Sequence, residues 1–134
     1  MNVLVCTPDP THSGGVARSS ARVVASLRAR GHTVVHLFPE EHRFPGDVDR
    51  GDTWRIPRCG PPAWVAHVDA AIQAVEPHVV VGFYGWGPAQ AAVAAASVRG
   101  VPAVVALRGN DVDRDLLDPS QHALVRWAIE RASA

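Results

Sequence analysis

Two apolar runs, Val3-Leu4-Val5-Cys6 and Val34-Val35-His36-Leu37-Phe38, decide the fold of this chain. Short unbroken runs of this kind are typical of strands buried on both faces, as in parallel sheets covered by helices. Between them, side chains recur with a helical period on one face: Val16, Ser20, Val23, Val24 and Leu27. The order of strand, helix and strand predicts a parallel βαβ unit, because two parallel strands need a crossover connection.

The rest of the chain continues this alternation. Prolines and capping residues mark helix starts, and Gly100 marks a helix end. These signals predict helices from Pro61 or Pro62 to Val75, over 88–99 and from Pro119 onward, and strands over 78–83 and 103–107. Residues 39–60 are dense in charge, with Trp54-Arg55-Ile56 predicted as a short edge strand. The sequence therefore predicts an α/β fold, a doubly wound, mostly parallel Rossmann-like sheet with helices on both faces, in which residues 1–134 form a single domain.

Composition and charge exclude several classes of protein. The chain of 134 residues balances 13 basic against 13 acidic residues, so no net charge attracts it to nucleic acid or to an anionic membrane. All the basic residues are arginines, which excludes a Walker A phosphate loop, a pyridoxal Schiff base and a catalytic lysine. Cys6 and Cys59 are too few for a disulfide framework and fit a reducing compartment. Without a targeting signal or an apolar stretch of about 18 residues, we expect a cytoplasmic protein with no transmembrane segment.

Ligands of doubly wound sheets bind at the carboxyl ends of the strands, where the strand order switches. Of the segments that follow predicted strands, the first contains Gly14 and Gly15 just before a helix. The free N–H groups and the positive end of that helix favour a phosphate, although a simple tight turn is the alternative. The pair is not part of a G-x-G-x-x-G motif, so no nicotinamide or flavin site is expected. His12, in the same segment, is either a proton donor or sugar contact, or a solvated loop histidine.

Two further segments carry aromatic and polar side chains after predicted strands. Tyr84 and Trp86 could stack on a sugar or an apolar acceptor, or could simply cover the end of the sheet. Arg108 could clamp a phosphate or carboxylate, and Asn110 and Asp111 could hydrogen-bond hydroxyl groups. The alternative for this third segment is an Asx turn with a solvated arginine.

Five short motifs occur in a fixed order along the chain. Ser13-Gly14-Gly15-Val16 stands before the predicted first helix, and Arg30-Gly31-His32-Thr33-Val34 stands after it. The others are Glu76-Pro77-His78-Val79-Val80-Val81, Gly100-Val101-Pro102-Ala103-Val104-Val105 and Arg108-Gly109-Asn110-Asp111. Together they resemble family 4 glycosyltransferases, over nearly the whole chain except residues 39–60.

This resemblance implies a GT-B enzyme, in which two Rossmann-like domains face each other across the active site. Such an enzyme moves a sugar from a nucleotide-sugar donor to an acceptor hydroxyl with retention of configuration, and needs neither a metal nor another cofactor. The N-terminal domain mostly binds the acceptor, which is a small molecule, a glycan or a lipid-linked compound. The resemblance implies donor-phosphate contacts for Gly14 and Gly15, and an acceptor side formed by His12, Tyr84, Trp86, Arg108, Asn110 and Asp111.

Two features depart from the family pattern. Arg108 stands where many relatives have a histidine, and the nucleotide-binding C-terminal half with its paired glutamates is absent from these residues. We therefore expect an acceptor-binding N-terminal half of a retaining glycosyltransferase that is inactive alone and whose partner is the C-terminal domain of the parent chain. The chain stops at Ala134, where a further strand is expected. This favours the half-enzyme over a standalone, non-catalytic binding or regulatory module.

A third interpretation is a metal-dependent GT-A transferase that uses Asp111 and Asp113. Their Asp-x-Asp spacing can hold a divalent cation. However, Asp47-Val48-Asp49 repeats the pattern elsewhere, and the histidines are scattered. No metal site is therefore predicted.

Overall fold

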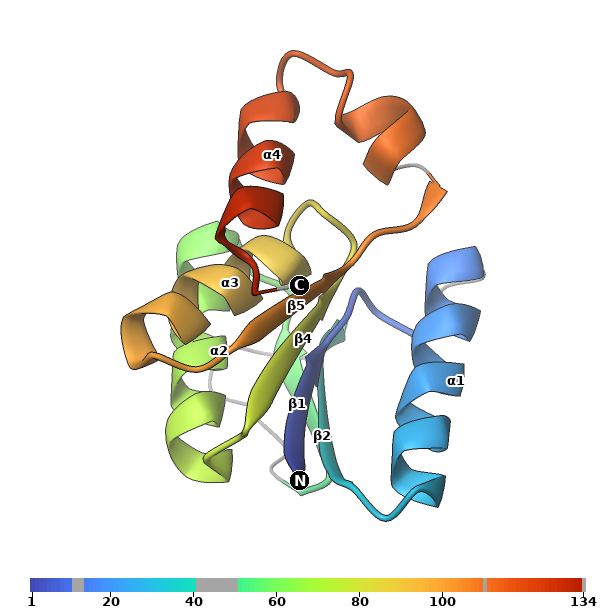
Figure 1. The fold of residues 1–134 in the computed structure, drawn as a ribbon, viewed down its shortest axis with the longest axis vertical. Coiled ribbons are helices and arrows are strands. Elements are labelled where there is room, and N and C mark those ends of the chain that lie inside the picture. Colours follow the sequence, from blue (N-terminus) through green and yellow to red (C-terminus); the bar gives the residue numbers. More distant parts are fainter. Residues whose placement is uncertain (11–13, 41–50, 110, 134) are drawn as a thin grey trace.

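A computed structural model describes residues 1–10, 14–40, 51–109 and 111–133, which fold around a parallel sheet (Figure 1). Its strands are β1 (Asn2–Cys6), β2 (Thr33–Glu40), β3 (Thr53–Pro57), β4 (Val79–Phe83) and β5 (Ala103–Ala106). They lie in the order β3-β2-β1-β4-β5, so the strand order switches between β1 and β4. In a Rossmann-like sheet of this order, ligands bind outside the carboxyl ends of those two strands.

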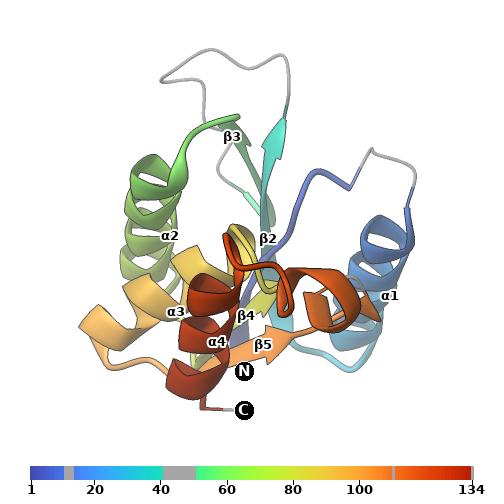
Figure 2. The same ribbon diagram turned by 90° about the horizontal axis from the view of Figure 1, so that it is seen from above.

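Helices cover both faces of the sheet, as the view from above shows (Figure 2). On one face lies α1 (Gly15–Ala29), and on the other lie α2 (Pro61–Val75), α3 (Pro88–Arg99) and α4 (His122–Arg131). The fold class predicted from the sequence is therefore confirmed, together with the βαβ unit and the edge strand around Trp54. Among the described residues, none of the helices has the length and apolar character needed to cross a membrane.

The position of β1 explains its unbroken apolar sequence. β1 pairs with β2 on one side and with β4 on the other. Leu4 and Cys6 pack into the core that α2 and α3 cover, whereas Val3 and Val5 pack on the α1 side. All four side chains are at most 2% exposed. A polar side chain at any of these positions would be buried without a partner, which is unfavourable.

The close approach of α3 to β4 places the segment that connects them. An ideal Cβ added to Gly82 of β4 would lie only 2.5 Å from the Cα of Ala89 in α3. The two backbones can come this close because neither carries a large side chain at the contact. Alanines fill most of the buried side of the helix: Ala89, Ala91, Ala92, Ala95 and Ala96. The segment 84–87 is therefore anchored at both ends to rigid elements.

The chain after β5 differs from the prediction. The last helix begins at His122 instead of Pro119. In the turn before it, the Asp118 carboxylate accepts hydrogen bonds from the amide and hydroxyl of Ser120 at 2.8 and 2.7 Å. The segment after β5 also contains a turn of π-helix, Asp111–Asp115, which the sequence did not predict.

Candidate active site

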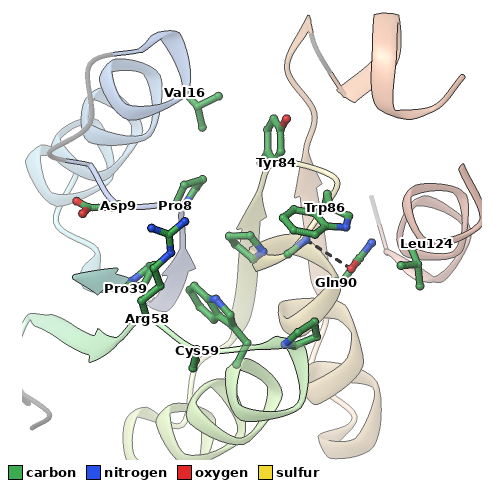
Figure 3. A pocket seen from close by; sticks show the side chains of 14 residues that line it. Pro8, Asp9, Val16, Pro39, Arg58, Cys59, Tyr84, Trp86, Gln90 and Leu124 are labelled. Atoms are coloured by element: carbon green, nitrogen blue, oxygen red, sulfur yellow. Dashed lines mark hydrogen bonds between the residues drawn. The ribbon is translucent and has the colours of Figure 1, made fainter. Parts of the chain in front are cut away.

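An open cavity of about 590 Å³ lies at the carboxyl ends of the strands (Figure 3). Four strands lead into its wall: Pro8 and Asp9 follow β1, Pro39 belongs to β2, Arg58 and Cys59 follow β3, and Tyr84, Trp86 and Gly87 follow β4. Helices supply the rest: Val16 of α1, Pro61 and Trp64 of α2, Pro88 and Gln90 of α3, and Leu124 of α4. The cavity therefore occupies the switch point of the sheet, where ligands of this fold bind.

The segment after β4 brings two aromatic side chains to the cavity. Tyr84 and Gly87 have φ angles of 74° and 78°, in the left-handed region, and they turn the chain from β4 into α3. The amide of Tyr84 donates a hydrogen bond to the carbonyl of Ala106 at 3.3 Å, which ties the turn to β5. The rings of Tyr84 and Trp86 both line the cavity. Because a left-handed tyrosine is strained, surrounding contacts must hold it in place.

Part of this support comes from the π-helix. Arg114 donates hydrogen bonds from Nη2 to the Tyr84 hydroxyl at 3.2 Å and from Nε to Oδ1 of Asp115 at 2.8 Å. Burial raises the pKa of Tyr84, and the hydrogen bond and negative charge of the buried Asp115 raise it further. The phenol is therefore neutral at physiological pH, and its hydroxyl is engaged with the π-helix.

Arg108 and Asp111 are not among the described residues that line the cavity. Asp111 has no exposed surface, and its Oδ2 accepts a hydrogen bond from the backbone amide of Arg108 at 2.7 Å. Burial raises the pKa of Asp111, and the amides of Arg108 and Gly85 oppose that rise. The guanidinium carbon of Arg108 lies 5.1 Å from the centre of the Phe83 ring, at cation–π distance. The side chains of Arg108 and Asp111 thus interact with other residues of the chain and not with the cavity.

Asp111 and Asp113 do not present a pair of carboxylates to one open space. Asp113 is exposed, whereas Asp111 is fully buried. Within the part of the chain that the structure describes, no group of three or more His, Cys, Asp or Glu side chains could hold a metal ion. The metal-dependent interpretation gains no support from this arrangement.

Gly14 and Gly15 lie at the start of α1, beside Val16 in the cavity wall. Both glycines are exposed, and a Cβ added to either would have no atom within 4 Å. The φ of Gly14 is 177°, an extended conformation that any residue adopts. The amides of a first helical turn have no partner within the helix. Open space and free N–H donors therefore occur together here, as an anion site requires.

The chain that leaves β1 is anchored by a buried polar pair. The Thr7 hydroxyl lies 2.8 Å from Nε2 of His36, and it donates a hydrogen bond to the Pro8 carbonyl at 2.8 Å. Since a hydroxyl has one hydrogen, His36 must be the donor to Thr7, which identifies the Nε2–H tautomer. Burial lowers the pKa of His36 to about 4, and the positive charge of Arg28 contributes. His36 is therefore neutral at physiological pH.

The sequence did not identify most of the cavity wall. It pointed to Tyr84 and Trp86, and to the segment between the first strand and first helix that contains Pro8 and Asp9. It did not point to Pro39, Arg58, Cys59, Gln90 or Leu124. The same rule that singled out the chain after β4 would have found Arg58 and Cys59, had the edge strand been given equal weight. Burial raises the pKa of the Cys59 thiol, so it is a neutral wall residue. Two predicted site residues, His12 and Asn110, lie outside the described residues.

These features define the class of protein as a Rossmann-like domain with an open cavity at its switch point, and the solved structures that share its fold include two epimerases. The UDP-GlcNAc 2-epimerase from Methanocaldococcus jannaschii matches with a TM-score of 0.73 and 8% identity, over 99% of this chain and 38% of its own. The UDP-GlcNAc 2-epimerase from Neisseria meningitidis, bound to UDP-GlcNAc, matches with a TM-score of 0.72 and 15% identity, over 98% and 39%. Such low identity shows the fold alone. This chain spans about two fifths of the length of either structure.

The family described as glycosyl transferase 4-like domain matches residues 14–134. Because this match covers most of the chain, the protein belongs to that family. The resemblance seen in the sequence motifs is thereby confirmed. Among curated proteins, none matches this sequence.

Proposed function

We propose that this domain is the acceptor-binding N-terminal half of a retaining glycosyltransferase, which moves a sugar from a nucleotide-sugar donor to an acceptor hydroxyl. The observation that carries the proposal is the open cavity at the switch point of a glycosyl transferase 4-like domain. One part of its wall carries aromatic rings, which suit an acceptor. Another part ends at the first turn of α1, whose free amides suit a phosphate.

The donor pyrophosphate binds at Gly14 and Gly15 in this proposal. The positive end of α1 favours its negative charge, and the absence of a Cβ lets the main chain approach it closely. The open space around both glycines is consistent with a ligand at this position. The neighbour from Neisseria meningitidis is bound to UDP-GlcNAc, which supports a nucleotide sugar as the donor class.

The acceptor side divides into contacting and supporting residues. Tyr84 and Trp86 contact the acceptor because their rings line the cavity. Asp111 supports them, since its carboxylate holds the backbone at Arg108, and the Arg108 guanidinium packs on the Phe83 ring that ends β4. His12 and Asn110 stay predicted acceptor contacts.

A second, C-terminal Rossmann-like domain supplies the nucleotide site and closes the cleft. The comparison structures support this view, because this chain matches about two fifths of each of them. The same proposal includes a cytoplasmic location. It also includes catalysis with retention of configuration, without a metal or another cofactor.

The isolated chain should transfer no sugar at a measurable rate. Transfer requires the leaving pyrophosphate and the attacking hydroxyl to be held together, and this domain supplies one wall of that cleft. Nucleotide sugars, UDP-GlcNAc included, would be incubated with the isolated chain and with the protein that joins it to a nucleotide-binding domain. Proton NMR of the product would report the anomeric configuration.

Each outcome of this experiment bears on the proposal. Turnover by the joined protein but not by the isolated chain, with the anomeric configuration of the donor retained in the product, supports the proposal. Turnover by the isolated chain contradicts the assignment of half a site, and an inverted product contradicts the retaining mechanism. Failure of the joined protein to turn over any donor favours a non-catalytic binding module.

A further inference from the structure

The described residues that line the cavity are mostly apolar. Three of these described side chains carry a charge or an amide, namely Asp9, Arg58 and Gln90. Prolines, an aliphatic side chain from each of α1 and α4, and the rings of Trp64, Tyr84 and Trp86 make up most of the remainder. A wall of this kind recognises an apolar surface.

Several polar groups of the described wall residues are engaged within the protein, whereas Nε2 of Gln90 has no hydrogen-bond partner among the described residues. Asp9 and Arg58 both interact with other groups. The Oε1 of Gln90 accepts a hydrogen bond from the Gly87 amide at 3.4 Å, and the Tyr84 hydroxyl accepts one from Arg114. A ligand that needs several hydrogen bonds would therefore have to displace existing ones.

A bare sugar is a poor ligand for such a wall. Each of its hydroxyls is both a donor and an acceptor, and a buried hydroxyl without a partner is unfavourable. An aromatic body has no such cost, and it stacks favourably on indole and phenol rings. Trp86 remains 44% exposed at the cavity, so a ligand that covers it would remove apolar surface from water.

We infer that the acceptor presents an apolar, ring-containing body to this cavity, with the attacking hydroxyl at its edge. This inference rests on the proposed function, because it describes the acceptor of that reaction. A volume of about 590 Å³ fits a molecule of a few fused rings. Figure 3 shows Trp86 and Leu124 on one side of the cavity and Pro8 and Val16 on the other. The rings pack against Trp86, and the hydroxyl points toward Val16, where the donor is proposed to bind.

Naphthol is a probe for this chemistry because it is a fused aromatic ring system with one hydroxyl. Isothermal titration of the isolated chain should show saturable binding at one site. Trp86→Ala should weaken this binding at least tenfold, since the stacking surface is lost. Trp127→Ala is the matched control, because Trp127 is also partly exposed, at 36%, but lies outside the cavity wall. It should change the affinity less than twofold.

Two further probes separate the sources of affinity. Methyl glucoside offers sugar hydroxyls without an apolar body, and octyl glucoside offers an alkyl chain in place of a ring. Neither should bind as tightly as naphthol. Tighter binding of methyl glucoside would overturn the apolar acceptor, and tighter binding of octyl glucoside would replace the ring with a lipid chain. Naphthol binding that survives Trp86→Ala would place the probe elsewhere, for example in the shallow groove beside Leu117 and Ile129, and would overturn the inference.

This experiment uses no donor, so its failure is distinguishable from failure of the proposed function. If naphthol does not bind but the joined protein transfers sugar to a hydrophilic acceptor, only the acceptor class is wrong. If naphthol binds at Trp86 but the joined protein consumes no nucleotide sugar, the cavity chemistry stands and the transferase proposal is wrong.

Discussion

The chain segments after β1 and around the end of β4 flank the same cavity, and both contain glycines. The structure explains why one of these segments holds glycines but not why the other does. Around β4, Gly82 has no room for a side chain, and Gly85 has room for one only if neighbouring side chains shift. A Cβ on Gly82 would meet the Ala89 backbone at 2.5 Å, and one on Gly85 would lie 3.0 Å from Val125. Gly87 has a φ of 78°, which side chains rarely adopt.

After β1, by contrast, nothing in the described structure requires glycine. A Cβ on Gly14 or Gly15 would meet no atom within 4 Å, and neither residue has a left-handed φ. The glycines near β4 are thus explained by packing and backbone conformation inside the domain. These two causes do not account for the pair at α1, and we propose that a closely approaching donor phosphate is the reason for that pair.

The largest effect is expected at Gly82. Gly82→Ala should lower the free energy of unfolding by more than about 3 kcal/mol, because the new Cβ would push the backbones of β4 and α3 apart. Urea denaturation followed by circular dichroism would measure the change. The control is Gly14→Ala, which adds the same atom in open space. Because Gly14 is the N-cap of α1, where alanine is less favourable than glycine, this variant should lose no more than about 1 kcal/mol. Equal stability of the two variants would contradict the close approach.

The β1 side should instead respond to pH, because a polar pair anchors it. The pKa of His36 is about 4 in the folded protein and 6.5 as its ordinary value, so the unfolded state binds more protons between these two values. Stability should therefore fall as the pH drops from about 6.5 to about 4, by on the order of 3 kcal/mol. Urea denaturation across this range would measure the fall.

A variant without the imidazole identifies the source of that pH dependence. His36→Gln keeps an N–H donor near Thr7 but cannot titrate, so its stability should vary less with pH over the same range. His32→Gln is the control because His32 is outside the buried core. If His32→Gln flattens the profile as much as His36→Gln, the buried pair is not the cause.

A smaller effect is expected where the β4 segment meets the π-helix. Tyr84 is the single tyrosine of the chain, so its ionisation can be followed directly by ultraviolet absorbance. Asp115→Asn should lower the pKa of Tyr84 toward its ordinary value of 10.0, because Asp115 raises it by a hydrogen bond and by charge. Asp113→Asn removes an exposed carboxylate from the same turn and should have less effect. An unchanged pKa in Asp115→Asn would show that burial alone raises it.

The comparison also shows what the sequence could and could not predict. The strands were predictable because β1, β2, β4 and β5 are apolar over most of their length, and Tyr84 and Trp86 were found because they directly follow such a strand. Trp64 lies within the helix predicted from Pro61 or Pro62 to Val75 and was not assigned to a site, yet it is 7% exposed and lines the cavity. Trp64 lines the same cavity as Arg58 and Leu124 because of the way α2, β3 and α4 pack together. No local sequence pattern encodes that packing.

Polar residues were harder to interpret than apolar ones, for a physical reason. Asp111 and Asp118 both have a sequence context that suits an exposed role, a ligand contact for one and a helix cap for the other. In the structure, Asp111 binds the amide of Arg108, and Asp118 caps the turn at Ser120. A short carboxylate can satisfy nearby backbone donors in several geometries, so the sequence alone does not determine which donors it takes.

The smallest effect on stability is expected at Gly15, where the effect on function should be large. Gly15→Val places a side chain in open space at the exposed start of α1, so the free energy of unfolding should change by less than about 0.5 kcal/mol. In the protein that joins this domain to a nucleotide-binding domain, the same side chain would keep the donor pyrophosphate from the helix amides. Transfer should then fall more than about tenfold, or roughly 1.4 kcal/mol in the barrier. Steady-state kinetics with the donor varied, together with thermal unfolding of the same variant, would separate lost function from lost structure.

Gly51→Val is the matched control, since Gly51 is equally open but lies before the amino end of β3, away from the cavity. A folded Gly15→Val enzyme with unchanged kcat and donor KM would mean that no phosphate binds there, and the difference between the two groups of glycines would then have no functional cause.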